Sequence, residues 1–194
     1  MPARVPTVSE CYALFGTYGS PARSIHHCLR VNQVAVFLAE ALALKGVDVD
    51  LELVDRASLL HNLHKHLETP TQHHAELSAR VLTDYPELAE IVRQHPSEMI
   101  LDPKRAPRTL ESKIVHYADR RVMKDEIVPL ETKLYRALAK QLLRGDNSLV
   151  PQLMVPLVRL EQEIFAPLDI SPMDLQRLQV LRLNHDARHL IPAR

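Results

Sequence analysis

The chain is patterned for α-helix along most of its length, and this periodicity limits its fold more than any other property. Residues of one expected helix face recur every three or four positions, as in His27, Val31, Val34 and Leu38. Almost no segment alternates apolar with polar residues, as a half-buried strand would, and the 194 residues include only four glycines. We therefore expect an all-α fold.

The expected helices follow one another with mostly short connections. A helix that begins at Thr109 should carry Asp119, and Pro156 should kink or break one of the late helices. Residues 96–107 hold three prolines and several charges and are expected to form a loop. The length suits one domain, 1–194, with a core of about 22–140 and a C-terminal helical extension of about 141–194. The other helices are expected at 9–18, 22–45, 51–66, 71–84, 86–95, 129–144, 148–165 and 171–186.

Composition gives no sign of a nucleic-acid or membrane partner. Lysine plus arginine and aspartate plus glutamate both number 24. No stretch approaches the roughly 18 uninterrupted apolar residues of a membrane span, and the start Met-Pro-Ala-Arg-Val-Pro lacks the apolar run of a signal peptide. Cys11 and Cys28 match no zinc-finger or redox spacing, and Cys28 is expected to be a small core residue. We expect a cytoplasmic protein that binds neither nucleic acid nor membranes.

Histidines are the residues that point to chemistry. Eight of the eleven lie between residues 26 and 95, and the series His27, His61, His74, His95 is closed by Asp119. Imidazole and carboxylate are the usual protein ligands of Zn, Mn and Fe. A single histidine on an apolar helix is more often a hydrogen-bonded core residue. Ligands drawn from separate helices, however, indicate a buried mononuclear or polynuclear site, provided that the rings converge on one pocket.

Three sequence segments carry a resemblance to a known family. They are His27-Cys-Leu-Arg-Val31, Leu59-Leu-His-Asn-Leu-His-Lys65 and Lys113-Ile-Val-His-Tyr-Ala-Asp119. Together they resemble the HD-domain superfamily of metal-dependent phosphohydrolases over about residues 22–140, and His74 and His95 match two accessory histidines of its two-metal members. Asn62 stands where the superfamily's signature aspartate is expected.

The resemblance implies a fold, a cofactor and a reaction. The fold would be an HD-type helical bundle with additional C-terminal helices, and the substrate a nucleotide or another small phosphate ester. One or two divalent transition-metal ions (Mn, Fe, Co, Ni or Zn) would be bound. Lys65, four residues after His61, would lie on the same helical face and neutralise charge on phosphoryl oxygens, with Asn62 as the second catalytic residue. The implied metal ligands are His27, His61, Asn62 and Asp119, with His74 and His95 for a second ion.

Asn62 leaves the function open between several alternatives. Its amide offers one carbonyl oxygen and no negative charge, so metal affinity should be weakened and a second metal lost. The protein has lost catalysis and kept a binding role, or retains a mononuclear site of His27, His61 and Asp119, or is an altered version of an active enzyme. As a binding protein it would take a phosphorylated ligand or a partner protein. A helical interaction module with relic histidines is a further alternative.

The remaining candidates have simpler interpretations. His26, His64, His66, His73 and His116 are expected at the surface or behind the ligands, and His64 has the best claim to line the pocket. Arg30, Arg120, Lys124, Lys104 and Arg105 could contact a substrate phosphate, but solvated surface is the preferred interpretation. Apolar positions of the late helix are expected to serve in packing or as the surface of a homodimer: Leu153, Val155, Leu157, Leu160 and Ile164.

Overall fold

The chain folds almost entirely into helices, which confirms the all-α prediction. The computed structural model describes residues 5–143, 150–181 and 183. Its α-helices are α1 (Val8–Thr17), α2 (Ala22–Leu44), α3 (Leu51–Leu60), α4 (His74–Arg80), α5 (Pro86–Gln94), α6 (Leu110–Arg120), α7 (Leu130–Leu143) and α8 (Val150–Phe165). Short 3-10 helices are η1 (Lys65–Leu67), η2 (Ser97–Leu101) and η3 (Pro172–Val180). In the described parts of the chain the one sheet is an antiparallel hairpin of β1 (Val122–Met123) and β2 (Glu126–Ile127).

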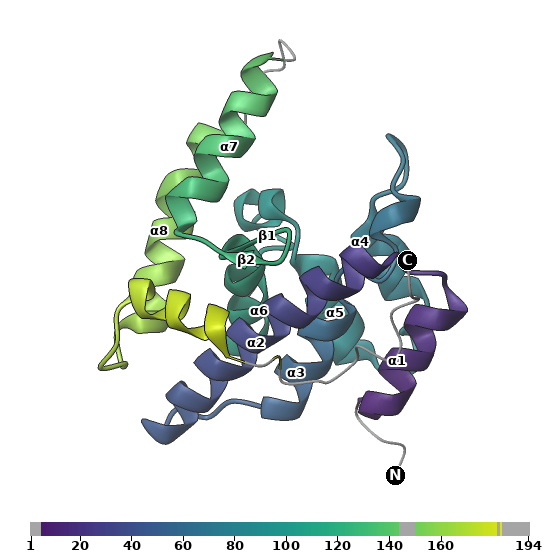
Figure 1. Cartoon of the computed structure of the whole chain (residues 1–194), viewed down its shortest axis with the longest axis horizontal. Coiled ribbons are helices and arrows are strands. Elements are labelled where there is room, and N and C mark those ends of the chain that lie inside the picture. Colours follow the sequence, from purple (N-terminus) through teal and green to yellow (C-terminus); the bar gives the residue numbers. More distant parts are fainter. Residues whose placement is uncertain (1–4, 144–149, 182, 184–194) are drawn as a thin grey trace.

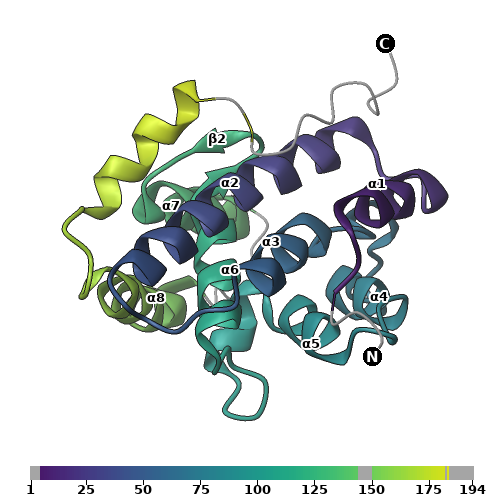
Figure 2. The same ribbon diagram turned by 90° about the horizontal axis from the view of Figure 1, so that it is seen from below.

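Helix α2 is the centre of the fold. It packs across α3 and α6, as Figures 1 and 2 show from two directions. Val31, Val34 and Leu38, which share its predicted inner face, are completely buried. Among the described helices α2 alone has the length and hydropathy of a membrane span, and 56% of that stretch is buried inside the protein. This burial fits the central helix of a bundle.

Helix α3 ends earlier than the periodicity predicts. The expected helix 51–66 stops at Leu60, and His61 is its C-cap. The imidazole Nδ1 of His61 lies 2.7 Å from the carbonyl oxygen of Ser58, at the helix end where backbone carbonyls lack intrahelical partners. Beyond Leu60 the bonds are of the tighter 3-10 kind, such as the amide of Leu63 to the carbonyl of Leu60. His95 ends α5 in the same way, because its Nδ1 lies 2.7 Å from the carbonyl oxygen of Val92.

Other elements also differ from the expectation. The predicted loop 96–107 contains η2, and the hairpin was not expected because two-residue strands are too short to show alternation. Helix α8 runs through Pro156 without a break, while Leu153 and Leu157 on either side of it are buried against the rest of the fold. The first part of the predicted helix 171–186 is the 3-10 helix η3, and residues 182 and 184–186 lie outside the described residues.

Helices α7 and α8 pack against each other and project from the body as an arm (Figure 1). Four of the five late apolar positions, Leu153, Leu157, Leu160 and Ile164, are buried as predicted, whereas Val155 is exposed. On α7 the apolar side chains of Tyr135, Leu142 and Leu143 are exposed. The arm spans the predicted boundary near residue 141, and the division of the chain stays a prediction.

Candidate metal centre

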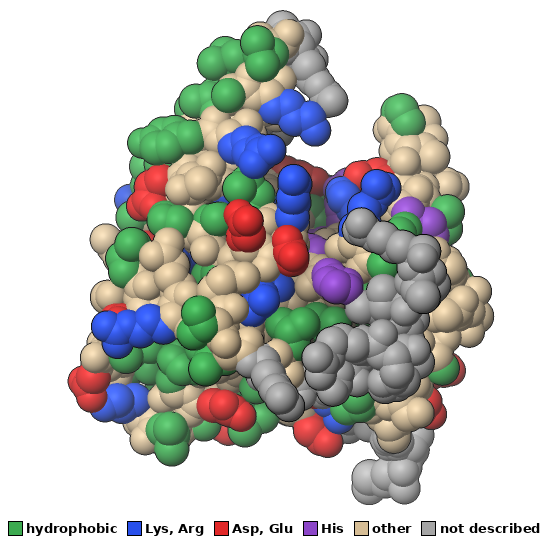
Figure 3. Space-filling view, viewed as in Figure 1, with side chains coloured by type: hydrophobic (Ala, Val, Ile, Leu, Met, Phe, Trp, Pro, Cys, Tyr) green, Lys and Arg blue, Asp and Glu red, His purple; other side chains and the backbone are tan. Residues whose placement is uncertain are grey.

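The predicted ligands meet at one cavity of about 850 Å³. It opens between the start of α2, the hairpin, the α4 side and the base of α7, where Figure 3 shows a hollow flanked by histidine and charged side chains. His61 is completely buried just behind the wall of the cavity. The other five predicted ligands line it: His27, Asn62, His74, His95 and Asp119.

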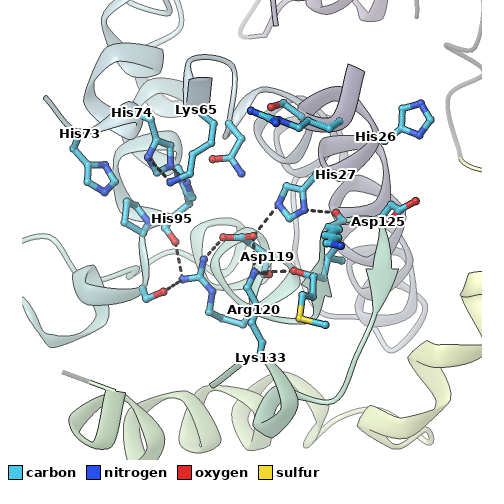
Figure 4. Close-up of a pocket in the computed structure, with 18 of the residues that line it drawn as sticks. His26, His27, Lys65, His73, His74, His95, Asp119, Arg120, Asp125 and Lys133 are labelled. Atoms are coloured by element: carbon cyan, nitrogen blue, oxygen red, sulfur yellow. Dashed lines mark hydrogen bonds and ion pairs between the residues drawn. The ribbon is translucent and has the colours of Figure 1, made fainter. Parts of the chain in front are cut away.

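His27, His61 and Asp119 form one compact group of possible ligands. Their ligand atoms all lie within 4.8 Å of one another, although they come from α2, the end of α3 and the last turn of α6. The Asp119 Oδ1 lies 3.1 Å from Nε2 of His27 and 4.0 Å from Nε2 of His61. The Thr109 side chain starts α6 by accepting from the amide of Ser112, and this helix presents Asp119 to the cavity (Figure 4).

Backbone carbonyls fix which nitrogen of each ring faces the cavity. The Nδ1 atoms of His27, His61 and His95 each lie 2.7 Å from a carbonyl oxygen, that of Lys124, Ser58 and Val92 respectively. A carbonyl oxygen only accepts, so each Nδ1 carries a hydrogen, and Nε2 is the nitrogen left for another partner. Histidines that bind metals are oriented in this way.

His74 and His95 direct their Nε2 atoms toward each other. The Nδ1 of His74 lies 2.6 Å from the Oε1 of Glu68, and the two Nε2 atoms lie 3.0 Å apart. Burial raises the pKa of Glu68, but hydrogen bonds from Lys65 and His74 outweigh it and lower this pKa to about 2. The ionised carboxylate therefore accepts the hydrogen bond from Nδ1 of His74. The two Nε2 atoms then face each other as acceptors. Two ligand atoms that each lie about 2.1 Å from one ion, with an angle of about 90° between them at the ion, are about 3.0 Å apart. The distance between the two Nε2 atoms therefore fits a shared metal ion.

The buried rings are uncharged at neutral pH. Burial is the main cause and lowers the pKa of His61 to about 3. Burial and the nearby Lys65 lower the pKa of His74 to about 4, and burial with His61 holds the pKa of His95 well below its usual value. Since a metal binds the neutral ring, these histidines are ready to act as ligands without losing a proton.

Asp119 is surrounded by two cations that were not expected in the site. Arg120 bonds Oδ2 of Asp119 and donates to the hydroxyl of Ser97 at 2.6 Å. Lys133 of α7 lies 3.1 Å from Oδ1 and also donates to the carbonyl oxygens of Asp119 and Val122. Burial raises the pKa of Asp119, but Arg120 and Lys133 outweigh this effect and hold the pKa well below its usual range. The prediction that Arg120 lies on the solvated surface was wrong, because its side chain is buried against Asp119. The only sign of this contact in the sequence was that the two residues are neighbours.

Asn62 points into the site but is not a charged ligand. Its Nδ2 lies 2.8 Å from Nε2 of His61, to which it donates a hydrogen bond. Its Oδ1 is buried and has no hydrogen-bond partner in the described part of the chain. Half a turn of the amide would exchange the two atoms and direct Oδ1 toward the region that the His61 lone pair faces. The side chain therefore suits either a metal-free or a metal-binding site.

Lys65 lines the cavity in a different setting from the one predicted. Because α3 ends at Leu60, Lys65 lies on η1, and the expectation of a shared helical face with His61 was wrong. Its Nζ lies 2.6 Å from Oε2 of Glu68 and 3.2 Å from Nδ1 of His74. Glu68, which the sequence analysis missed, thus supports both Lys65 and His74. The flanking Thr69-Pro70 loop gave no signal of this role.

The remaining histidines support the fold or the rim of the cavity. His64 is buried, packs on the ring of Tyr18 at 4.5 Å between centroids and does not line the cavity, contrary to expectation. His116 is completely buried, and its Nδ1 lies 3.0 Å from the carbonyl oxygen of Gln94. His26 and His73 line the cavity, while His66 does not.

His73 lies in a further cluster that does not suit a metal. Its Nε2 lies 3.5 Å from an oxygen of Glu68 and 3.2 Å from one of Glu98. The Nδ1 accepts from the amide of Ala75 at the start of α4, so the hydrogen of the neutral ring is on Nε2. A protonated Nε2 donates to carboxylates and leaves no lone pair for an ion.

Comparison with known proteins identifies the family. The family model described as HD domain matches residues 24–124, which is more than half of the chain. The chain belongs to the HD domain family. Members of this family typically bind divalent metals, and the group of His27, His61 and Asp119 is of the kind that holds such an ion. The matched segment ends at Lys124, so Lys133 comes from beyond it.

One similar protein comes from an archaeon. It is an uncharacterized protein of Methanocaldococcus jannaschii that is 36% identical over 108 residues, which cover 49% of this chain and 63% of that protein. The match therefore spans less than two thirds of the relative. No solved structure matches the chain.

Proposed function

We propose that this HD-domain protein is a metal-dependent phosphohydrolase that acts on a nucleotide or another small phosphate ester. The observation that carries the proposal is the orientation of four rings. His27, His61, His74 and His95 each have Nδ1 bound to an acceptor, which turns four Nε2 atoms toward one site that also contains Asp119. Imidazoles oriented together in this way are typical of a metal site rather than of an apolar core.

The residues of the site have distinct roles in this proposal. His27, His61 and Asp119 hold the first ion, with Asn62 as a neutral neighbour, and His74 and His95 offer two ligands to a second. A divalent ion such as Mn, Fe, Co, Ni or Zn supplies a Lewis acid for the phosphoryl group and activates water. Arg120 and Lys133 fix the Asp119 carboxylate, Arg120 at Oδ2 and Lys133 at Oδ1.

Lys65 is the cation best placed to approach a phosphoryl oxygen. Its side chain is exposed at the cavity, whereas Arg120 is buried and bound to Asp119. The hydrogen bond to Glu68 holds the Lys65 ammonium near His74. An ammonium at this position would stabilise negative charge that develops on phosphate oxygens.

A second function, binding without turnover, is favoured by the contacts of Asn62. The amide satisfies the Nε2 lone pair of His61 without an ion, and Asp119 is already neutralised by Arg120 and Lys133. Such a site would keep its polar groups paired while a phosphorylated ligand or a partner protein occupied the cavity. The two functions differ in one measurable property, which is turnover.

Location and assembly stay predictions. The buried cysteines Cys11 and Cys28 are free thiols, and burial raises the pKa of each to about 12, which suits a reducing cytoplasm. The exposed apolar residues of α7 support a homodimer formed through the arm. No nucleic-acid or membrane partner is proposed.

The test is a panel of nucleotides and sugar phosphates assayed for phosphate release with added Mn, Fe, Co, Ni or Zn. We expect turnover that chelator abolishes and that His61→Ala lowers at least about a hundredfold. His66→Ala is the matched control, because His66 does not line the cavity. Turnover that survives both chelator and His61→Ala would refute the proposal. No turnover, with a nucleotide raising the melting temperature, would select the binding function.

A further inference from the structure

The loop of the β-hairpin has an unusual residue at its first position. The register pairs Met123 with Glu126, so the loop consists of Lys124 and Asp125 alone. Lys124 has φ +59°, and no other non-glycine residue described by the structure has a positive φ. Glycine, asparagine and aspartate normally occupy such positions, because a longer side chain strains the backbone there. A lysine at this position therefore calls for an explanation.

The backbone of the loop is needed for the metal centre, but the lysine side chain is not needed for that backbone. The Lys124 carbonyl oxygen accepts from Nδ1 of His27 at 2.7 Å and so orients this ring. The Asp125 carbonyl oxygen accepts from Arg30 at 3.0 Å and from Gln179 at 3.3 Å. A glycine in place of Lys124 would allow the same carbonyl positions with less strain.

Positive charge is distributed unequally around the cavity. Lys65 is paired with Glu68, while Arg120 and Lys133 are paired with Asp119. Arg23 and Lys124 also line the cavity, are exposed, and make no ion pair with any acid that the structure describes. Asp125, which follows Lys124 in the loop, also lines the cavity, and its negative charge favours the charged form of Arg30. Of these five cations, the two without such an ion pair thus lie at the α2 and hairpin end.

We propose that Lys124, together with Arg23, forms a second anion subsite at this end of the cavity. The proposal rests on the proposed function and specifies its substrate: a phosphate ester with a second anionic group, such as a diphosphate or a bisphosphate. A cavity of about 850 Å³ has room for more than the one phosphate that the metal centre would hold. An unpaired ammonium and guanidinium suit a phosphate group, to which charge-assisted hydrogen bonds are strong.

The experiment compares two inert ligands that differ in one anionic group. Propylphosphonate and propane-1,3-diphosphonate contain carbon–phosphorus bonds and cannot be hydrolysed as esters. Their dissociation constants are measured by calorimetry for the wild-type protein, Lys124→Gln and Lys124→Arg. Lys104→Gln is the control, because Lys104 is also exposed but does not line the cavity.

We expect the wild-type protein to bind the diphosphonate about tenfold more tightly than the monophosphonate. Lys124→Gln should lose most of this preference, whereas Lys124→Arg and Lys104→Gln should keep it. Lys124→Gly should also lose the preference while its melting temperature rises, a combination that a purely structural lysine would not produce. A full preference in Lys124→Gln would overturn the subsite. Because both ligands are inert, the preference is measured whether or not the protein hydrolyses esters.

Discussion

At the scale of single residues, the function depends on how the site manages with one carboxylate. Asp119 is the only acid among the predicted ligands, and its charge is shared by Arg120 and Lys133. Asn62 adds a buried oxygen without a hydrogen-bond partner among the described residues, but no charge. The group of His27, His61 and Asp119 and the pair of His74 and His95 therefore carry little negative charge to attract divalent ions.

Asn62→Asp tests this interpretation. The new carboxylate would lie beside His61 and supply the missing charge, so we expect tighter metal binding by about tenfold to a hundredfold and stronger hydrolysis. Metal affinity is measured by competition with a coloured chelator. The control is Gln152→Glu, which adds the same charge at an exposed position outside the cavity lining. Unchanged affinity in Asn62→Asp would show that charge at position 62 is irrelevant.

His116 predicts a pH dependence of stability. Burial, followed by the nearby Arg120, lowers its pKa to about 3 from an ordinary value near 6.5. Between these two pH values His116 binds a proton in the unfolded chain but not in the folded protein. Its contribution to the free energy of unfolding is therefore fully present above about pH 6.5 and is lost as the pH falls toward 3.

In His116→Asn the amide can still donate to the Gln94 carbonyl but does not titrate. Between pH 7.5 and 5.0, its free energy of unfolding should fall by about 2 kcal/mol less than that of the wild-type protein. Urea unfolding at the two pH values measures both falls. Equal falls would mean that His116 is not held neutral.

At the scale of elements, the ends of helices create the site. His61 and His95 are C-caps of α3 and α5, and each ring bonds the carbonyl three residues earlier. Lys133 has a related role, since it binds the carbonyl oxygens of Asp119 in the last turn of α6 and of Val122 at the start of β1. Helix ends thus supply both ligands and the support behind them.

Lys133→Met should lower the free energy of unfolding by about 2 kcal/mol, because oxygens at the end of α6 would lose their donor while largely buried. Urea unfolding measures the loss. Lys140→Met on the same helix is the control, as Lys140 is exposed and should change stability by less than about 0.5 kcal/mol. A loss as small as that of the control would show that the Lys133 contacts contribute little.

The sequence predicted the helices and the candidate metal ligands better than it predicted the residues that hold those ligands in place. Periodicity located α2 and α5 closely, and the order of His27, His61 and Asp119 anticipated a group that the structure brings together. It failed where side chains compete with the backbone, as at His61, because apolar spacing continues past the end of α3. Glu68 and Lys133 were missed since their contacts depend on tertiary placement alone.

At the scale of the whole molecule, an ion in the site would connect parts of the chain far apart in sequence. The ligands come from α2, α4, α6 and the ends of α3 and α5, which pack around one another beside the arm (Figures 1 and 4). The unfolded chain cannot bring these groups together, so an ion should bind the folded protein almost exclusively.

Metal removal should therefore destabilise the protein. At a free ion concentration 100 times the dissociation constant, binding adds about 2.7 kcal/mol to the free energy of unfolding. We expect chelator to lower the melting temperature of the wild-type protein by several degrees and to leave that of His61→Ala almost unchanged. Calorimetric scans with and without chelator give the comparison. An equal response of both proteins would place the stabilising ion elsewhere.

The most direct test of the metal centre is elemental analysis of the purified protein beside His61→Ala and the control His66→Ala. The account predicts at least one transition-metal ion per chain in the wild-type protein and in His66→Ala, and almost none in His61→Ala. The same metal content in all three proteins, or none in the wild-type protein after incubation with each of the five metals, would contradict it.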